Sequence, residues 1–201
     1  MPESTKIDVN ALLRKAGISP ATADATMVVD GLLQEWRRRA AKRELSIRAL
    51  RDLGLDIDQA QLDVLIVVYG AEANSTSADG EVMVSSVAER LGIDPSRASR
   101  LVSEMVETGY TRRAVSQADA RRTIIELTDA GRAVVEAIRA YKFLVMGDFL
   151  SRWSPEQLAM FVPMMQEFAA WQAHTEHSSG KFAADIAEIA EKISRFRPVK
   201  V

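Results

Sequence analysis

The sequence predicts a mostly α-helical protein of the α+β class with one small β-hairpin. Apolar residues recur at helical spacing over long segments, for example at Val28, Leu32 and Trp36. Helix-capping pairs such as Asp94-Pro95 precede several of these segments. β-prone residues flank a polar turn in one region, between residues 110 and 127. These three observations set the fold class.

The composition excludes several classes of protein. The chain has 201 residues, 47% of them hydrophobic, which suffices for one large or two small domains with a core. Its formal net charge of −2 argues against a general polyanion binder, so affinity for nucleic acid must come from local clusters of arginine. The absence of cysteine excludes disulfides, thiolate metal sites and a cysteine-based peroxide sensor.

The N-terminal segment MPESTKID lacks the charged start and apolar core of a secretory signal. The longest apolar runs, such as Val64 to Tyr69, are too short to span a bilayer. We therefore expect a cytoplasmic protein with no membrane partner.

Residues 84–105 have the pattern of two short helices joined by a tight turn. Ser85 or Ser86 is expected to cap the first helix, and Gly92 to end it. Asp94-Pro95 then starts the second helix. The second helix turns an apolar face inward, formed by Ala98, Leu101, Val102 and Met105. This is the arrangement of a helix-turn-helix.

The outward face of the second helix carries small hydroxyl groups and two arginines. It is formed by Ser96, Arg97, Ser99, Arg100, Ser103 and Glu104. Such a face suits the major groove of DNA. An ordinary helical hairpin with a solvated, charged face would have the same spacing, so the continuation of the chain is needed to decide between them.

Tyr110 to Val115 and Thr123 to Leu127 are predicted to pair as two strands around the turn SQADARR. A hairpin behind a recognition helix is a wing, placed to touch phosphate or the minor groove. Four arginines lie in or beside it: Arg112, Arg113, Arg121 and Arg122. The sequence therefore predicts a winged helix-turn-helix that binds double-stranded DNA.

The run from Val84 to Arg132 resembles the MarR family of transcription regulators. The matching features are LGIDPSRASRLVSEMVETGYTRR, the D-x-R of the wing at Asp119 to Arg121, and LTDAGR at Leu127 to Arg132. Flanking helices in the expected order extend the resemblance to residues 20–173. The resemblance implies a homodimeric winged-helix protein whose DNA affinity is often lowered by a small ligand.

The same resemblance implies roles for individual residues. Ser96, Arg97, Ser99 and Arg100 would face the groove. Arg121 would enter the minor groove, and Asp119 would hold that arginine in place. Two departures stand out: Glu104 occupies a position where the family often has a basic residue, and Ser116-Gln117 replaces the usual Asp-Pro before the tip of the wing.

We divide the chain into five parts from these patterns. They are an N-terminal extension (1–19), an N-terminal dimerisation helix (20–57), the winged helix-turn-helix lobe (58–127), C-terminal dimerisation helices (128–173), and a linker with an extra amphipathic helix (174–201). The extension should hold a helix from Val9 to Lys15. The second part should be one long helix to about Leu53, with a break near Ser46. The final helix must bury its apolar stripe against its own domain or a sister subunit.

A dense basic run precedes the lobe. It comprises Arg37, Arg38, Arg39, Lys42, Arg43, Arg48 and Arg51. We interpret it as a solvated face, with additional phosphate contacts as the alternative.

The resemblance also suggests control by an apolar or aromatic small molecule. Trp36, Tyr69 and Tyr141 are expected to converge where the lobe meets the dimerisation helices, and these would be the ligand-binding residues. The alternative is that they are packed core.

Other functions have less support. The two histidines, His174 and His177, both fall in the predicted linker, and no P-loop or G-x-G-x-x-G occurs, so an enzyme, a metal site and a bound cofactor are not expected. The predicted function is a sequence-specific transcription regulator that acts as a homodimer on a palindromic operator. Repression is favoured over activation. A winged helix used for protein–protein contact, or a DNA-binding protein without ligand control, remain alternatives.

Overall fold

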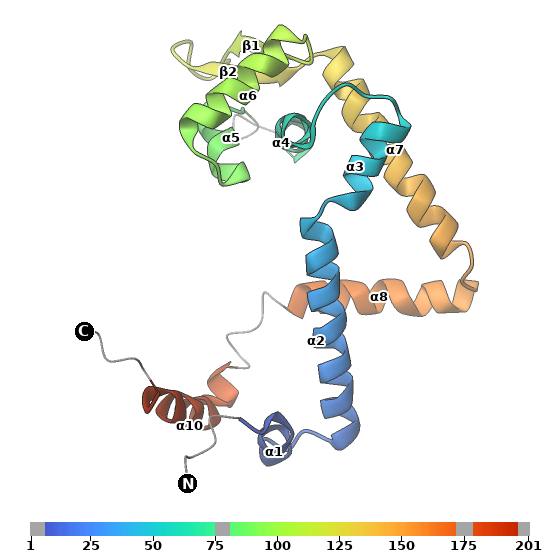
Figure 1. Ribbon diagram of the computed structural model, residues 1–201, viewed down its shortest axis with the longest axis vertical. Helices are drawn as coiled ribbons and strands as arrows, with labels where there is room; N and C mark the ends of the chain where they lie inside the picture. The colour runs from blue at the N-terminus through green and yellow to red at the C-terminus, as the bar shows by residue number, and fades with distance from the viewer. Residues whose placement is uncertain (1–6, 75–80, 172–178, 197–201) are drawn as a thin grey trace. The chain divides into compact units, whose positions relative to one another are not determined.

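The computed structural model describes residues 7–74, 81–171 and 179–196 (Figure 1). The chain divides into two units. One is formed by Met1–Ala41 together with Trp153–Val201, and the other by Lys42–Arg152. The described helices are not long and apolar enough to cross a membrane.

The first unit contains helices from both ends of the chain: α1 (Val9–Lys15), α2 (Pro20–Ala41), α8 (Pro155–Trp171) and α10 (Ala183–Ser194). The start of α1 was predicted correctly, and Asp8 caps it by accepting the N–H of Ala11 at 3.0 Å. Ser154 and Gln157 have the spacing of a reciprocal cap and form one at the start of α8, and Pro163 lies inside that helix. Lys15 of α1 forms ion pairs with Asp185 and Glu188 of α10.

The second unit contains the remaining elements, which follow the predicted order. They are α3 (Glu44–Asp52), α4 (Gln59–Asn74), α5 (Val84–Leu91), α6 (Pro95–Glu107), β1 (Thr111–Val115), β2 (Thr123–Leu127) and α7 (Asp129–Leu150). The strands are antiparallel, with Thr111 opposite Leu127 and Val115 opposite Thr123. The sequence of residues 81–84 also predicts a short strand that would pair with the wing. Only a bridge forms there, between Val82 and Ile125, because α5 already begins at Val84.

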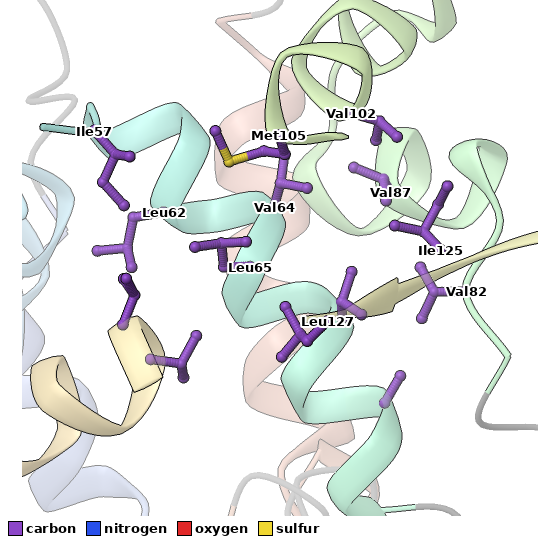
Figure 2. Packing of buried hydrophobic residues seen from close by; sticks show 14 of the residues in the cluster. Ile57, Leu62, Val64, Leu65, Val82, Val87, Val102, Met105, Ile125 and Leu127 are labelled. Carbon is purple, nitrogen blue, oxygen red and sulfur yellow. The ribbon is translucent and has the colours of Figure 1, made fainter. Parts of the chain in front are cut away.

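The hydrophobic core lies in this second unit and is centred on α4 (Figure 2). Leu62, Val64, Leu65 and Val68 of α4 are fully buried. They pack with apolar residues of five neighbouring elements, including Val87, Val102, Met105, Ile125, Leu127, Val134 and Ile138. Helical spacing predicts a core face of Leu62, Leu65, Ile66 and Tyr69 for this helix. The prediction is wrong for Ile66, whose side chain is 44% exposed.

The predicted long helix from residue 20 to 53 is broken earlier than expected. α2 ends at Ala41, and α3 begins at Glu44. Arg43 between them has a φ of +52°, in the left-handed region, which a right-handed helix cannot contain. Its guanidinium forms an ion pair with Asp63 of α4. The break therefore lies at Lys42–Arg43 and not near Ser46.

Candidate nucleic-acid interface

The turn between α5 and α6 has the geometry that the sequence indicated. Gly92 ends α5 in the left-handed region with a φ of +63°, where glycine carries no steric penalty. Asp94 caps α6, and its Oδ1 accepts the N–H of Arg97 at 2.8 Å. The predicted cap of α5 was wrong. Met83 is the capping residue, and Ser86 lies in the first turn, where its Oγ accepts the Met83 N–H at 3.4 Å.

One face of α6 is fixed in the core. Ala98, Val102 and Met105 are each 0% exposed, and Leu101 is half-buried. The opposite face is exposed and presents Ser96, Arg97, Ser99 and Arg100. The helix is therefore held in one rotation about its axis, with the predicted contact residues outward.

Arg97 and Arg100 are available for a partner. Within residues 7–74, 81–171 and 179–196, the structure gives neither guanidinium a hydrogen bond or an ion pair. Ser96 is engaged instead, because its hydroxyl donates to Asp94 Oδ1. This bond, followed by the Arg97 N–H, holds the pKa of Asp94 below its usual range. Ser96 therefore offers a new partner mainly its oxygen lone pairs.

Two further side chains at the α6 surface have protein partners. Glu104 accepts a hydrogen bond from Gln61 Nε2 of α4 at 3.3 Å. Ser103 Oγ accepts one from Arg113 Nη2 of β1 at 3.3 Å. The recognition helix is thus connected by polar contacts to α4 on one side and to the wing on the other.

The four arginines of the wing differ in their surroundings. Arg112 is paired across the strands with Glu126, with 2.8 Å between Nη2 and Oε2. Arg122 lies 3.6 Å from Asp119 Oδ2. Arg121 is exposed, and among the described residues its guanidinium has no hydrogen bond or ion pair. Arg113 has only the hydrogen bond to the neutral Ser103 hydroxyl, so Arg121 is the wing arginine whose side chain has no partner among the described residues.

Asp119 contacts the main chain of Arg121. Its Oδ1 accepts the backbone N–H of Arg121 at 3.0 Å, and its ion pair is with Arg122. Asp119 therefore fixes the main chain at Arg121 and leaves that guanidinium unpaired.

The LTDAGR segment joins the wing to α7. Thr128 caps α7 by accepting the Gly131 N–H at 3.2 Å, and its own hydroxyl donates to the Gly109 carbonyl at 2.7 Å. A Cβ atom on Gly131 would lie 2.0 Å from the carbonyl oxygen of Tyr110. Glycine is required there because the backbones approach so closely.

Sequence reasoning missed Glu81 as part of this region. Its carboxylate accepts hydrogen bonds from the Ser116 hydroxyl at 2.6 Å and from the Gln117 N–H at 3.1 Å. Ser116 is 3% exposed. The only signal in the sequence was the unusual Ser116-Gln117 pair, and nothing pointed to a partner 35 residues away.

The three residues proposed for a ligand belong to different units. Tyr69 and Tyr141 lie in the second unit, and Trp36 lies in the first, where it is 68% exposed. Tyr69 Oη accepts a hydrogen bond from Arg139 at 2.7 Å, and that guanidinium lies over the Tyr69 ring, 5.3 Å from its centre. Tyr141 Oη donates to Asp52 at 2.7 Å, which raises the pKa of Tyr141 and lowers that of Asp52. A common ligand site for the three residues stays a prediction.

Much of the basic run is neutralised within the chain. Arg38 and Arg39 both pair with Glu35 at 2.7 Å, and Arg51 pairs with Asp52 at 2.9 Å. This pairing favours the interpretation of a solvated face. The described residues contain no cluster of three or more possible metal ligands, and His174 and His177 lie outside them.

The antiparallel hairpin directly follows α6, which is capped at its start and buried on one face. This arrangement defines a winged helix-turn-helix protein. In a comparison with known proteins, residues 55–122 match the model of the MarR family. This match supports the predicted resemblance of the chain to winged-helix transcription regulators of the MarR family.

Two relatives from Bacillus subtilis (strain 168) are uncharacterised HTH-type transcriptional regulators. YdgJ is 25% identical over 109 residues, which are 54% of this chain and 62% of YdgJ. YfiV is 22% identical over 141 residues, 67% of this chain and 83% of YfiV.

Solved structures share the fold. Tm0710 from Thermotoga maritima has a TM-score of 0.58 at 20% identity, covering 74% of this chain and 97% of its own. RV1404 from Mycobacterium tuberculosis has a TM-score of 0.56 at 19% identity, covering 74% and 94%. S. aureus MepR bound to ethidium bromide has a TM-score of 0.51 at 20% identity, covering 69% and 95%.

Proposed function

We propose that the chain binds double-stranded DNA in a sequence-specific way and represses transcription. The observation that carries this proposal is the outward face of α6. Arg97 and Arg100 are exposed there, without side-chain partners among the described residues, on a helix whose other face is buried. Arginine is the side chain that most often reads guanine in the major groove. A DNA-binding role would place the chain in the cytoplasm with the chromosome.

The wing would supply contacts that depend less on sequence. Arg121 is exposed at its tip, with its backbone fixed by Asp119. A lone arginine in this setting suits phosphate or a narrow minor groove. Arg113 and Arg122 are proposed as additional phosphate contacts.

The salt dependence of binding tests this proposal against a winged helix used for protein–protein contact. A labelled duplex is selected by the protein from a random-sequence pool, and its affinity is measured at several salt concentrations. If the protein makes about six phosphate contacts, binding releases the counterions of those phosphates. Raising the salt concentration from about 50 to about 200 mM would then lower the affinity about 10³-fold or more. Absence of a selected sequence, or an affinity that does not respond to salt, would contradict DNA binding.

We further propose a homodimer assembled through residues 20–57 and 128–173. Large apolar side chains are exposed on α2, on α8 and on the last turns of α7, including Leu32, Trp36, Met160, Met164, Phe143 and Leu144. Exposed apolar surface of this extent indicates an interface. A twofold dimer would read a palindrome with half-sites about 34–36 Å apart, or a multiple of that distance. Sedimentation as a monomer at micromolar concentration would contradict the dimer.

A small aromatic or apolar molecule is proposed to release the DNA. Tyr69, Tyr141 and Trp36 would bind it, and the structure of MepR with ethidium bromide supports an aromatic ligand for this fold. A ligand that binds the DNA-free conformation about 1–3 kcal/mol more tightly than the DNA-bound conformation would weaken DNA binding roughly 5- to 150-fold. A thermal-shift screen of aromatic compounds, followed by DNA titration with each hit, tests this. A hit that leaves DNA affinity unchanged would favour a regulator without ligand control.

A further inference from the structure

The tip of the wing, residues 116–122, is held by a side-chain network that extends beyond the hairpin. The Ser116 hydroxyl donates to Glu81 Oε2 at 2.6 Å, and Glu81 Oε1 accepts the N–H of Gln117 at 3.1 Å. The same hydroxyl oxygen accepts the N–H groups of Ala118 at 3.1 Å and Asp119 at 3.0 Å. A serine hydroxyl has one proton and two lone pairs, so its bonding capacity is filled.

The network continues to the exposed arginine. Asp119, whose N–H is held by Ser116, accepts the N–H of Arg121 with its own carboxylate at 3.0 Å. The loop is closed by two main-chain bonds between Ser116, Asp119 and Arg122. A continuous series of hydrogen bonds thus leads from Glu81 to the main chain at Arg121.

Glu81 is attached to the helix-turn-helix. Its neighbour Val82 accepts the N–H of Ile125 at 2.7 Å, and α5 begins at Val84. The carboxylate that holds the wing tip is therefore only three residues from the first helix of the motif. Through the contact between Glu81 and Ser116, which are 35 residues apart in the sequence, residues 81–84 connect α5 to the tip of the wing.

We infer that Glu81 and Ser116 are positioning residues for DNA binding. They fix the wing tip relative to the helix-turn-helix, so that Arg121 is already ordered when DNA arrives. This inference rests on the proposed function. Its physical basis is that a contact from a preordered loop loses less conformational entropy on binding than one from a free loop. Neither residue needs to touch DNA.

Ser116→Ala is the first test. It removes the hydroxyl that joins Glu81 to the backbone of the tip. On the selected duplex, affinity should fall about tenfold, within the range of couplings measured inside one hydrogen-bond network. The slope of affinity against salt should fall by about one, as expected for a lost phosphate contact. Ser194→Ala is the matched control, because that hydroxyl donates to the Glu191 carbonyl in α10 at 2.6 Å, outside the DNA-binding lobe and the proposed dimer helices, and should leave binding unchanged.

A double-mutant cycle separates positioning from a general loss of structure. If Ser116 acts through Arg121, Ser116→Ala with Arg121→Ala should bind no more weakly than Arg121→Ala alone. Losses that add independently would overturn the inference. Melting temperatures are measured for each variant. If Ser116→Ala does not fold at the assay temperature, Glu81→Ala replaces it, since that change leaves the bonds from Ser116 to the tip backbone in place.

A polarity swap gives a second readout. Ser116→Asp places two carboxylates together and should weaken binding as Ser116→Ala does. Adding Glu81→Gln should restore affinity to within about threefold of wild type, because the amide donates to the new carboxylate and still accepts the Gln117 N–H.

If wild type shows no salt-dependent DNA binding, the proposed function fails. If wild type binds and Arg121→Ala weakens it, but Ser116→Ala and Glu81→Ala bind like wild type, only this inference fails.

Discussion

Arg132 of α7 and Glu72 of α4 form an ion pair with 2.6 Å between Nη2 and Oε2. The other oxygen of Glu72 accepts the backbone N–H of Leu127 in β2 at 3.2 Å. The carboxylate raises the pKa of Arg132, first through the hydrogen bond that it accepts from the guanidinium and then through its charge. One side chain therefore joins α4, the wing and α7.

Replacement of Glu72 should destabilise this unit. Glu72→Ala leaves both the Leu127 N–H and the Arg132 guanidinium without their acceptor. We expect the free energy of unfolding to fall by about 1–2 kcal/mol, at the low end for a charged hydrogen bond because both side chains are partly exposed. Urea denaturation measures the loss. Glu72→Gln keeps an acceptor for Leu127, so a loss as large as that of Glu72→Ala would argue against the main-chain bond.

Gly131→Ala should be more harmful than its position near a helix start suggests. The new Cβ would lie 2.0 Å from the Tyr110 carbonyl oxygen, which is backbone and cannot rotate away. We expect a loss of about 3 kcal/mol, the upper part of the usual range for overpacking. Gly147→Ala is a control in the same helix, where nothing lies within 4 Å of the new atom. It should be neutral or stabilising by up to about 1 kcal/mol. Equal thermal shifts for the two variants would contradict the packing argument.

The parts of the fold that depend on local signals were predictable. Capping residues act on N–H groups two or three positions away, so Asp94 marked the start of α6 correctly. The inward face of α6 followed from spacing because that helix has one buried side. The wing followed from β-prone residues around a polar turn.

Other features depend on contacts between distant residues and left little signal. α4 contacts α5, α6, α7 and β2, so its apolar residues are spread around the helix and spacing did not distinguish Val64 from Ile66. Arg43 breaks the long helix with a left-handed residue and an ion pair to Asp63. The Glu81–Ser116 contact joins residues that no periodic pattern relates.

The recognition helix yields a prediction about base specificity. Arg97→Ala or Arg100→Ala should each cost about 1–3 kcal/mol on the selected duplex if the arginine makes a bidentate contact to guanine. The loss should be confined to one base position, where the variant no longer discriminates. Competition titration with single-position duplex variants measures this. Full affinity of the Arg97→Ala, Arg100→Ala double variant would exclude α6 as the reading helix.

Two arginines of the wing should differ in their effect on salt dependence. Arg121→Ala should lower the salt slope by about one and weaken all sequences alike. Arg112→Ala should have a smaller effect, because Arg112 is already paired with Glu126 and contributes less free charge. Affinities for selected and random duplexes at several salt concentrations provide the comparison. A larger change of slope for Arg112→Ala would mean that the strand, and not the tip, contacts phosphate.

The cap of α6 predicts a pH dependence of stability. The Ser96 hydroxyl is the largest cause of the lowered pKa of Asp94, followed by the N–H of Arg97. A folded-state pKa below the unfolded value of about 3.9 means that the folded chain binds this proton less tightly. The stabilisation is then complete above that unfolded value and is lost as the pH falls through the folded pKa.

Asp94→Asn keeps a capping oxygen but cannot titrate, so it serves as the reference. The difference in urea midpoint between wild type and Asp94→Asn should be constant near neutral pH and should shift against wild type in acid. Ser96→Ala removes the hydroxyl that is the main cause of the lowered pKa of Asp94, so this pKa should move back toward its usual value. An NMR titration of the Asp94 carboxyl group would measure the change directly. An Asp94 titration that is the same with and without the Ser96 hydroxyl would show that the cap does not depend on this bond.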